Sequence, residues 1–384
     1  MPVRATKRGA ERTPLDADVD VLICGASFAG LAAARELAGS GARVMVIDRY
    51  EIGERQTSAC AAPTLWLTNL GLESTIRQTF GDLVVHTSRS TIRYHLPWTF
   101  STFDYPALCA ALAGQGDFAF DTAKVESITR GETHTVHTDR GDLRAPLVVD
   151  ALGWRRVLGR DLRIQPPDAR LSRGLEAHPA GTGRDMELWI DGRVIRAGYG
   201  WSFPAADEVR VGVGSFDPHD HVKQPTVDLA TELNRPLNGY QGNWIPHQLR
   251  PAVSEDVFFA GDSAGHCLPL TAEGIRTAFY FGLAAGRELR AVVEGRQTRA
   301  QALARYGAFS DSHARAYRWL LRMQHLVGPL NDRPPLVDRI MRAVDRQWWI
   351  DRFFNRYLAV APPEFVFAAG APRRGGRPAA AAAA

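Results

Sequence analysis

The residues from Gly261 to Gly282 combine one acidic side chain, several small residues and the start of a helix. The stretch reads GDSAGHCLPLTAEGIRTAFYFG, in which Asp262 lies between glycine and serine and Gly274 precedes a strongly helical segment. Small residues leave backbone groups exposed, and the N–H groups at a helix N-terminus carry partial positive charge. Electron-rich atoms bind at such positions. The stretch therefore predicts a site for an electron-rich group, the alternative being a strand-to-helix loop with one solvated aspartate.

A second stretch with informative spacing is VDVLICGASFAGLAAARELAGSGARVMVIDR, near the N-terminus. Gly25, Ser27 and Gly30 occupy the positions of a G-x-G-x-x-G fingerprint after an apolar strand, and Asp48 ends the next strand. In this pattern the glycines permit a tight turn and close helix packing, the helix N-terminus binds a pyrophosphate, and the acid accepts from ribose hydroxyls. Ser27 departs from the glycine pattern, but its hydroxyl is small and can donate a hydrogen bond. The pattern predicts a dinucleotide site that favours FAD or NAD over NADP, because Asp48 repels a 2′-phosphate.

The Gly261 stretch resembles the second FAD motif of the large two-domain flavoproteins, which include aromatic hydroxylases, halogenases and geranylgeranyl reductases. The residues that carry the resemblance are FFAGDSAGHCLPLTAEGIRTAF, with the spacing from Gly261 through Pro269 to Gly274. It implies that Asp262 binds the ribityl chain and that the Gly274–Ile275 backbone lies at the pyrimidine edge of the isoalloxazine, where helix N–H groups stabilise reduced flavin. The cofactor expected is non-covalent FAD. The residues expected to bind it are Gly25, Ser27, Phe28, Ala29, Gly30, Asp48, Arg49, Val125, Gly261, Asp262, Pro269, Glu273, Gly274 and Ile275.

The segment GYGWSFPAADEVRVGVG, residues 198–214, resembles the Tyr-x-Trp-x-Phe-Pro cavity motif of the geranylgeranyl reductase family. Tyr199, Trp201 and Phe203 alternate, so all three project from one face of a strand. Such an aromatic wall suits a flat or prenyl substrate lying against the flavin. The alternative is core packing beneath a sheet.

Cys60 is the one candidate catalytic residue. It lies in DRYEIGERQTSACAAPTLWLTNLGL, which resembles the segment of the same family in which a cysteine faces the cavity. The glycines that usually follow this cysteine are replaced by residues 61–63, Ala-Ala-Pro. A catalytic and a purely structural role for Cys60 therefore both stay open.

The segment LVVDALGWRRVLGR separates the branches of the resemblance. Leu152 replaces the aspartate that aromatic hydroxylases carry there, and the halogenase Trp-x-Trp-x-Ile-Pro signature is absent from the sequence. The leading interpretation is an FAD-dependent oxidoreductase that reduces carbon–carbon double bonds of an apolar isoprenoid. The alternatives are an FAD monooxygenase or halogenase acting on an aromatic or polyketide metabolite, and a non-catalytic flavin-binding protein. No second nucleotide fingerprint is found, so we expect either NAD(P)H as a transient donor or another protein that supplies electrons.

These motifs require a particular set of elements to position them. Apolar runs predict strands at 19–24 and 43–47 around a helix at 30–38, a helix at 65–80, and an antiparallel sheet from 187–213. The expected fold is α/β, a Rossmann-like FAD-binding domain with an inserted antiparallel substrate-binding sheet and a helical C-terminal region. The expected divisions are a basic disordered tail at 1–17, the FAD-binding domain at 18–90, 104–160 and 250–296, the substrate-binding β domain at 91–103 and 161–249, the helical region at 297–369 and a disordered tail at 370–384.

Composition excludes several other classes. The net charge of +4 is small and spread over dispersed arginines, which argues against a nucleic-acid partner. Four separated cysteines without a CxxC pair or a histidine cluster argue against a metal site. No apolar run is long enough to span a membrane, and the N-terminus lacks the apolar region of a secretory signal. The expected location is the cytoplasm.

The C-terminal stretch VDRIMRAVDRQWWIDRFFNRYLAVAPPEFVF interleaves arginines with aromatic residues such as Trp348, Trp349, Phe353, Phe354 and Tyr357. At helical spacing this pattern fits a lid packed on the catalytic domain, which we favour. It also fits a basic amphipathic surface that makes peripheral contact with an anionic membrane carrying a lipid substrate.

Overall fold

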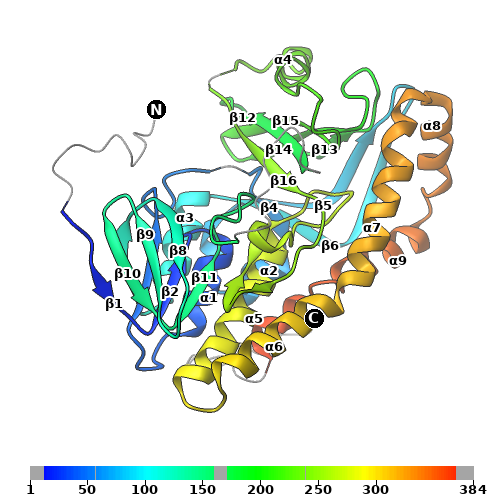
Figure 1. The fold of residues 1–384 in the computed structure, drawn as a ribbon. Coiled ribbons are helices and arrows are strands. Elements are labelled where there is room, and N and C mark those ends of the chain that lie inside the picture. The colour runs from blue at the N-terminus through cyan, green and yellow to red at the C-terminus, as the bar shows by residue number, and fades with distance from the viewer. Residues whose placement is uncertain (1–12, 57, 160–170, 238, 369–384) are drawn as a thin grey trace, which may run out of the picture.

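The computed structural model describes residues 13–56, 58–159, 171–237 and 239–368. The tail expected at 370–384 and most of the one expected at 1–17 lie outside these residues. Residues 13–17 differ from the expectation of disorder, because the Leu15 N–H donates to the Arg140 carbonyl oxygen at 2.8 Å and the short strand β1 (Ala17–Asp18) pairs with β10 (Gly141–Ala145). The chain folds into a nucleotide-binding half, a second half built on a large sheet, and a run of C-terminal helices along both (Figure 1).

The first half is built on a six-stranded sheet. Its order is β17 (Val253–Ser254), β18 (Val257–Phe259), β11 (Leu147–Asp150), β2 (Val21–Cys24), β3 (Val44–Asp48) and β7 (Ala119–Thr122), all parallel except β17. Strand β2 is apolar and buried along its whole length, as expected of a parallel strand covered on both faces. The expected strand–helix–strand opening is present as β2, α1 (Phe28–Glu36) and β3.

Helix α1 packs against α5 (Ile275–Val293), and small residues bring the two helices close together. A Cβ atom at Gly282 would lie 2.4 Å from the Ala29 carbonyl oxygen, and one at Gly286 would lie 2.5 Å from that of Ala33. Such distances are sterically forbidden, so these two glycines permit the contact. The contact joins the first and the second nucleotide motif, which are about 250 residues apart in sequence.

A four-stranded sheet lies beside the parallel one. It contains β1, β10, β9 (His134–Thr138) and β8 (Val125–Thr129). Helix α3 (Tyr105–Ala113) packs against α1. Asp104 caps α3 by accepting from the Ala107 N–H at 2.9 Å.

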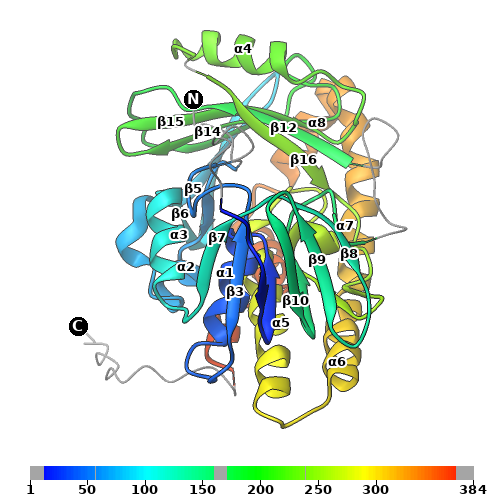
Figure 2. The ribbon, with the colours of Figure 1, turned by 60° about the vertical axis from the view of Figure 1, so that its left-hand side comes forward.

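The second half is built on an eight-stranded sheet, seen above the parallel sheet in Figure 2. Its order is β16 (Gln241–Pro246), β12 (Leu171–Ala177), β15 (Glu208–Ser215), β14 (Gly198–Ala205), β13 (Met186–Trp189), β5 (Ile76–His86), β6 (Thr91–Phe103) and β4 (Ala61–Pro63). The antiparallel pairing expected from 187–213 is present as β13, β14 and β15. Helix α4 (Lys223–Glu232) covers one face, where Val209, Val211 and Val213 pack against Leu229 and Ala230.

The prediction of a helix over residues 65–80 is correct only for its first turns and wrong for the rest. Helix α2 (Thr64–Asn69) is followed by a short 3-10 helix, η2 (Glu73–Thr75), and then by β5. Gly71 adopts a φ of 69° after the helix, and from Ile76 onward the chain pairs with β6. Strands β4 and β5 belong to the eight-stranded sheet of the second half. That half therefore begins before residue 91, where the substrate-binding β domain was expected to begin.

The C-terminal region is helical, as expected. It contains α6 (Arg299–Ser312), α7 (Ala314–Val327), η4 (Gly328–Asp332), α8 (Pro334–Ala343), α9 (Gln347–Leu358) and η5 (Pro363–Phe367). Helix α9 packs on β6, where Ile350 is buried with Val85, Ile92 and Tyr94. The Tyr94 hydroxyl also donates to the Met341 carbonyl oxygen at 2.9 Å. Helices α8 and α9 therefore lie against the edge of the second half, in the position of a lid.

Candidate functional site

A cavity of about 940 Å³ lies between the two halves and reaches the C-terminal helices. Its volume falls within the range typical of small-molecule and cofactor sites. Of the residues expected to bind the cofactor, all but Gly25, Gly30 and Pro269 line this cavity, and so do Cys60, Tyr199, Trp201 and Phe203. The structure therefore brings both nucleotide motifs and the aromatic segment to one place.

Gly25 and Gly30 shape the first turn through their backbone. Gly25 has a φ of 115°, and a Cβ atom there would lie 2.2 Å from the Ala151 carbonyl oxygen. A Cβ atom at Gly30 would lie 1.8 Å from the Gly25 carbonyl oxygen. Ser27 is the N-cap residue of α1, and its hydroxyl oxygen lies 3.1 Å from that of Tyr105. The turn thus presents the α1 N-terminus to the cavity, as pyrophosphate binding requires.

Asp48 stands at the end of β3 beside this turn. Its carboxylate accepts from the Ala26 N–H at 2.9 Å and from the Tyr50 N–H at 3.1 Å. Burial raises the pKa of the Asp48 carboxyl, and the two backbone hydrogen bonds oppose that shift. Cationic side chains gather at this end of the cavity, which favours a phosphate-bearing ligand; they are Arg49, Arg55, Lys124 and Arg155.

Asp262 opens the 3-10 helix η3 (Gly261–Ala264) at the opposite side of the turn. Its carboxylate lines the cavity and, among the described residues, accepts no hydrogen bond from a protein group. Burial raises the pKa of Asp262 to about 6, with Arg250 opposing the shift. A half-buried carboxylate that faces the cavity without a protein donor can accept hydrogen bonds from a ligand with hydroxyl groups, such as a ribityl chain.

The loop from Cys267 to Gly274 leads into α5 in an unusual conformation. Leu270 and Ala272 have φ values of 71° and 52°, in the left-handed region that residues other than glycine rarely adopt. The Leu270 N–H donates to the Gln324 side chain at 2.8 Å, and the Tyr199 hydroxyl donates to the Thr271 carbonyl oxygen at 2.5 Å. These contacts hold a strained backbone whose function is to open the α5 N-terminus, at Gly274, toward the cavity.

Glu273 lines the cavity, but its carboxylate is engaged by the protein. Arg276 donates to both of its oxygens, from Nε at 2.8 Å and from Nη2 at 2.9 Å, and the Tyr357 hydroxyl also donates to it. Glu273 thus joins the cofactor loop to α9. No local sequence pattern indicates this link, because Tyr357 lies 84 residues from Glu273.

Asp150, at the end of β11, is wholly buried and holds the centre of the site together. It accepts from the N–H groups of Leu152 at 2.9 Å and Leu158 at 2.8 Å, and from the Ser263 hydroxyl at 2.6 Å. Leu152 itself lines the cavity, so an apolar side chain stands where the hydroxylases carry an acid.

The aromatic wall is Tyr199, Trp201 and Phe203, on the cavity face of β14. Trp201 pairs in register with Gly212 on β15, and a Cβ atom at Gly212 would lie 2.2 Å from the Trp201 ring. The indole therefore lies across β15 in space that only glycine leaves open. At Gly214, in contrast, a Cβ atom would lie 3.4 Å from the indole, which is an ordinary contact.

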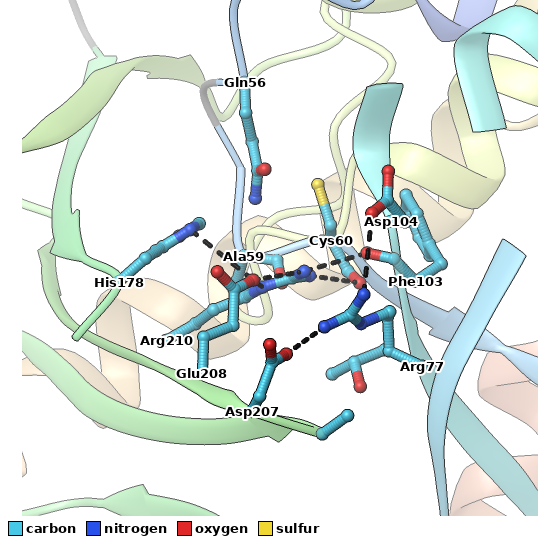
Figure 3. Close-up of polar contacts among 12 residues, drawn as sticks. Gln56, Ala59, Cys60, Arg77, Phe103, Asp104, His178, Asp207, Glu208 and Arg210 are labelled. Carbon is cyan, nitrogen blue, oxygen red and sulfur yellow. Dashed lines mark hydrogen bonds and ion pairs between the residues drawn. The ribbon is translucent and has the colours of Figure 1, made fainter. Parts of the chain in front are cut away.

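Cys60 is wholly buried and has a φ of 51°. Arg210 holds its backbone by donating to the carbonyl oxygens of Ala59 at 2.8 Å, Cys60 at 3.1 Å and Phe103 at 2.9 Å (Figure 3). Burial raises the pKa of the Cys60 thiol well above its usual range, with Arg210 opposing the shift. The thiol lines the cavity in its protonated form, and the structure leaves its role open.

Within the described part of the chain, no group of three or more His, Cys, Asp or Glu side chains is arranged to hold a metal ion. None of the described helices has the length and hydropathy needed to cross a membrane. The residues present do fit FAD: a glycine turn at a helix N-terminus, an acid at the end of β3, a half-buried carboxylate without a protein donor, and a second helix N-terminus open into one cavity.

Known proteins resemble this chain in both sequence and structure. A family model described as an FAD binding domain matches residues 18–79. Digeranylgeranylglycerophospholipid reductase 3 of Methanosphaera stadtmanae is 24% identical over 330 residues, which are 77% of this chain and 83% of that protein. Menaquinone reductase of Mycolicibacterium smegmatis is 29% identical over 321 residues, 70% of this chain and 74% of that protein. A solved geranylgeranyl bacteriochlorophyll reductase-like protein from Thermoplasma acidophilum has a TM-score of 0.77 at 18% identity and covers 92% of this chain and 98% of its own.

These similarities confirm four predictions from the sequence. The solved structure confirms the fold, and the family model confirms FAD as the cofactor. The relatives confirm the resemblance to geranylgeranyl reductases and the prediction of an FAD-dependent oxidoreductase.

Proposed function

We propose that this FAD-dependent oxidoreductase reduces carbon–carbon double bonds in the prenyl chain of a lipid or quinone. The observation that supports this most directly is the continuity of one cavity from the Asp262 loop, past the aromatic wall, to α8 and α9. Beyond Trp201 the lining becomes aliphatic, through Leu83, Val85, Met186, Leu188 and Ile190. A long apolar wall suits a prenyl chain better than a compact polar metabolite. The relatives named for a digeranylgeranyl lipid and for menaquinone both act on prenylated molecules according to their names.

The residues divide into those that hold the cofactor and those that hold the substrate. FAD, when bound, supplies hydride transfer. The turn at Gly25–Gly30 and Asp48 would hold its dinucleotide part, while Asp262 and the α5 N-terminus at Gly274 would hold the ribityl chain and ring. Tyr199, Trp201 and Phe203 orient the alkene and exclude water. We propose the remaining expected contacts, Phe28, Ala29, Arg49, Val125, Gly261, Pro269, Glu273 and Ile275, as supports of that cofactor site.

The substrate reaches the cavity from a membrane surface in this proposal. Exposed apolar side chains surround the α7–α9 end of the cavity and form what we call the aromatic rim: Trp319, Ile340, Val344, Trp348, Trp349 and Phe353. Exposed arginines accompany it, including Arg339, Arg342, Arg346, Arg352 and Arg356. Aromatic and basic residues together are typical of proteins that lie on anionic lipid. Helices α8 and α9 would thus act as both lid and membrane contact.

Vesicle binding tests the aromatic rim. A variant with Trp348→Ser and Trp349→Ser should bind anionic vesicles at least tenfold more weakly than the wild type. Leu65→Ser is the matched control, because Leu65 is similarly exposed but lies on α2, away from the aromatic rim. Equal binding by all three proteins would remove the membrane from the proposal.

The source of electrons is part of the proposal too. No dedicated nicotinamide fingerprint is present in the sequence, so NAD(P)H would bind transiently or an electron-donor protein would reduce the cofactor. Anaerobic mixing of the FAD-loaded protein with NADH or NADPH, followed by the loss of flavin absorbance, distinguishes these sources. Bleaching by neither nucleotide would favour a protein donor.

The proposed reaction is tested with dithionite as reductant, without oxygen, on geranylgeranyl lipid and on menaquinone. We expect a gain of two hydrogens for each double bond reduced, read by mass spectrometry. A product that carries an added oxygen or halogen atom and forms only in air would instead support the runner-up, an FAD monooxygenase or halogenase. No product with any substrate, despite bound FAD, would favour a non-catalytic flavin-binding protein.

A further inference from the structure

Glu176 lies on the cavity wall in the same cross-strand row as Trp201. Glu176 pairs in register with Gly212 on one side and with Gln241 on the other, and Gly212 pairs in turn with Trp201. Paired residues in neighbouring strands point to the same face of a sheet. Four strands therefore present one row to the cavity, in which the only charged side chain is that of Glu176. Gly212, between them, lets the indole reach the carboxylate.

The Glu176 carboxyl group is buried, and each of its oxygens contacts a neighbouring side chain. The Trp201 Nε1–H donates to Oε2 at 3.2 Å, and the Gln241 amide donates to Oε1 at 3.0 Å. His178 follows two residues later, just beyond the end of β12, with its Nε2 atom 3.0 Å from Glu176 Oε1 and 2.6 Å from the Gln241 side-chain nitrogen. The sequence signal for this pair is the spacing Glu-x-His at the end of a strand.

His178 connects Glu176 to a carboxylate nearer the surface. Its Nδ1 atom lies 3.9 Å from Glu208 Oε1, the contact drawn in Figure 3. Arg210 donates to the same oxygen from Nε at 3.0 Å and from Nη2 at 2.8 Å, which fixes Glu208 in place. The exposed fractions of the three side chains rise from 3% at Glu176 to 16% at His178 and 32% at Glu208. The three side chains thus form a row from the protein surface to the cavity, in which the 3.9 Å between His178 and Glu208 is a gap that one water molecule would bridge.

Reduction of an alkene requires a path for a proton. Hydride adds two electrons and one hydrogen to one carbon, so the other carbon must receive a proton from an acid. Two other groups along the cavity could donate this proton, but both are less suited. The Tyr199 hydroxyl already donates its proton to the Thr271 carbonyl oxygen, and burial raises the pKa of the Cys60 thiol, which makes it a weaker acid. A carboxylic acid that can be reprotonated through an imidazole is an effective general acid.

We propose that Glu176 donates the proton that completes alkene reduction, and that His178 and Glu208 carry the replacement proton from solvent. This inference rests on the proposed function. In the step, the Glu176 O–H bond breaks, its proton bonds to the carbon not attacked by hydride, and the carboxylate left behind takes a proton from the His178 Nε2–H. At the same time the His178 Nδ1 atom takes a proton that Glu208 has received from solvent, so the imidazole stays neutral, and rotation of its ring then returns the N–H to the side of Glu176.

The test compares Glu176→Gln with Glu187→Gln in the FAD-loaded protein. Glutamine keeps an oxygen that can accept from Trp201 but has no acidic proton. Glu187 is a matched control, because it lies 3.0 Å from a histidine, His86, on the same sheet without lining the cavity. Glu176→Gln should lower the rate of prenyl reduction by about 10²–10⁴-fold, whereas Glu187→Gln should leave it within about twofold of the wild type.

Two further measurements separate a proton donor from a support of the indole. The Trp201 indole N–H resonance, assigned with Trp201→Phe, should keep its chemical shift in Glu176→Gln. Added acetic acid should restore turnover to Glu176→Ala, whose missing side chain leaves space for it, but not to Trp201→Ala. A displaced indole resonance with a raised KM and an unchanged kcat would overturn the proposal in favour of a positioning role. If the wild type reduces no prenyl substrate, the proposed function fails first. If Glu176→Gln reduces it normally, only this inference fails.

Discussion

The guanidinium of Arg276, at the start of α5, donates to the backbone carbonyl oxygen of Tyr357, at the end of α9, from Nη1 at 3.1 Å and from Nη2 at 3.2 Å. The same group pairs with Glu273, directly before the helix N-terminus that faces the cavity. One buried cation therefore satisfies the last carbonyl groups of the lid helix and the carboxylate of the cofactor loop. Together with the Tyr357 hydroxyl, which donates to Glu273, this guanidinium joins α9 to the loop before α5.

Replacing Arg276 should both lower the stability of the fold and speed the release of FAD. Arg276→Leu leaves the Glu273 carboxylate buried without its cation, which costs about 3–5 kcal/mol in folding free energy. We expect that loss in urea unfolding, together with faster release of FAD, because the Glu273–Gly274 backbone would move. Arg356→Leu is the control, because Arg356 is exposed on α9, the helix that Arg276 contacts. It should change the free energy of unfolding by less than about 0.5 kcal/mol. Equal stability of the two variants would show that the buried contact contributes little.

Gly212 and Gly214 provide a matched pair for the aromatic wall. A Cβ atom at Gly212 would come 2.2 Å from the Trp201 ring and 2.7 Å from the Leu175 carbonyl oxygen, whereas one at Gly214 would have ordinary contacts, the nearest at 3.4 Å. Gly212→Ala should displace the indole and lower kcat/KM for a prenyl substrate by roughly ten- to a hundredfold, while FAD content stays normal. Gly214→Ala should retain most of that activity. The opposite order would mean that Trp201 is not part of the substrate wall.

The Cys60 thiol should be unreactive in the folded protein. It is wholly buried, and burial raises its pKa, so little thiolate forms at neutral pH. Iodoacetamide at pH 8 should label Cys60 only after unfolding, as followed by peptide mass spectrometry. Because Glu176 provides a proton donor in our proposal, Cys60→Ala should retain turnover within about tenfold. A loss of more than 10²-fold with normal FAD content would assign Cys60 a catalytic role.

The parts of the site that could be predicted depend on residues that lie close together in the sequence. Gly25, Gly30 and Asp48 belong to one strand–helix–strand unit, and Asp262 and Gly274 lie between strand β18 and helix α5. The spacing of two residues between Tyr199, Trp201 and Phe203 predicts that their side chains share one face of a strand, and all three line the cavity. Such features depend on backbone geometry over a few residues, which the sequence determines directly.

The parts that could not be predicted depend on contacts between distant segments. Arg210 reaches the Cys60 backbone across 150 residues, and Arg276 reaches Tyr357 across 81. The importance of Gly212 depends on strand register, since only the pairing of β14 with β15 puts Trp201 over it. The expected helix at 65–80 failed for a related reason: the residues after Ile76 gain their hydrogen bonds from β6, and helix propensity takes no account of that partner.

Asp262 should make opposite contributions to the stability of the FAD-free protein and to FAD binding. Its pKa is about 6 in the folded protein against a usual 3.8, so between these values the folded state binds more protons than the unfolded state. Stability therefore falls as pH rises from about 4 to about 6, by roughly 3 kcal/mol at most, given about 1.4 kcal/mol per unit of pKa shift.

Asp262→Asn removes this titration. The FAD-free variant should be more stable than the FAD-free wild type at pH 7, and the difference should disappear below pH 4. The same substitution loses a charge-assisted hydrogen bond to the cofactor, worth about 1.5–3 kcal/mol, so the Kd for FAD should rise by at least tenfold. Thermal unfolding across pH and titration of the FAD-free protein with FAD measure the two effects separately. If FAD affinity is unchanged while the stability profile flattens, the carboxylate is half-buried at this position but does not contact the cofactor.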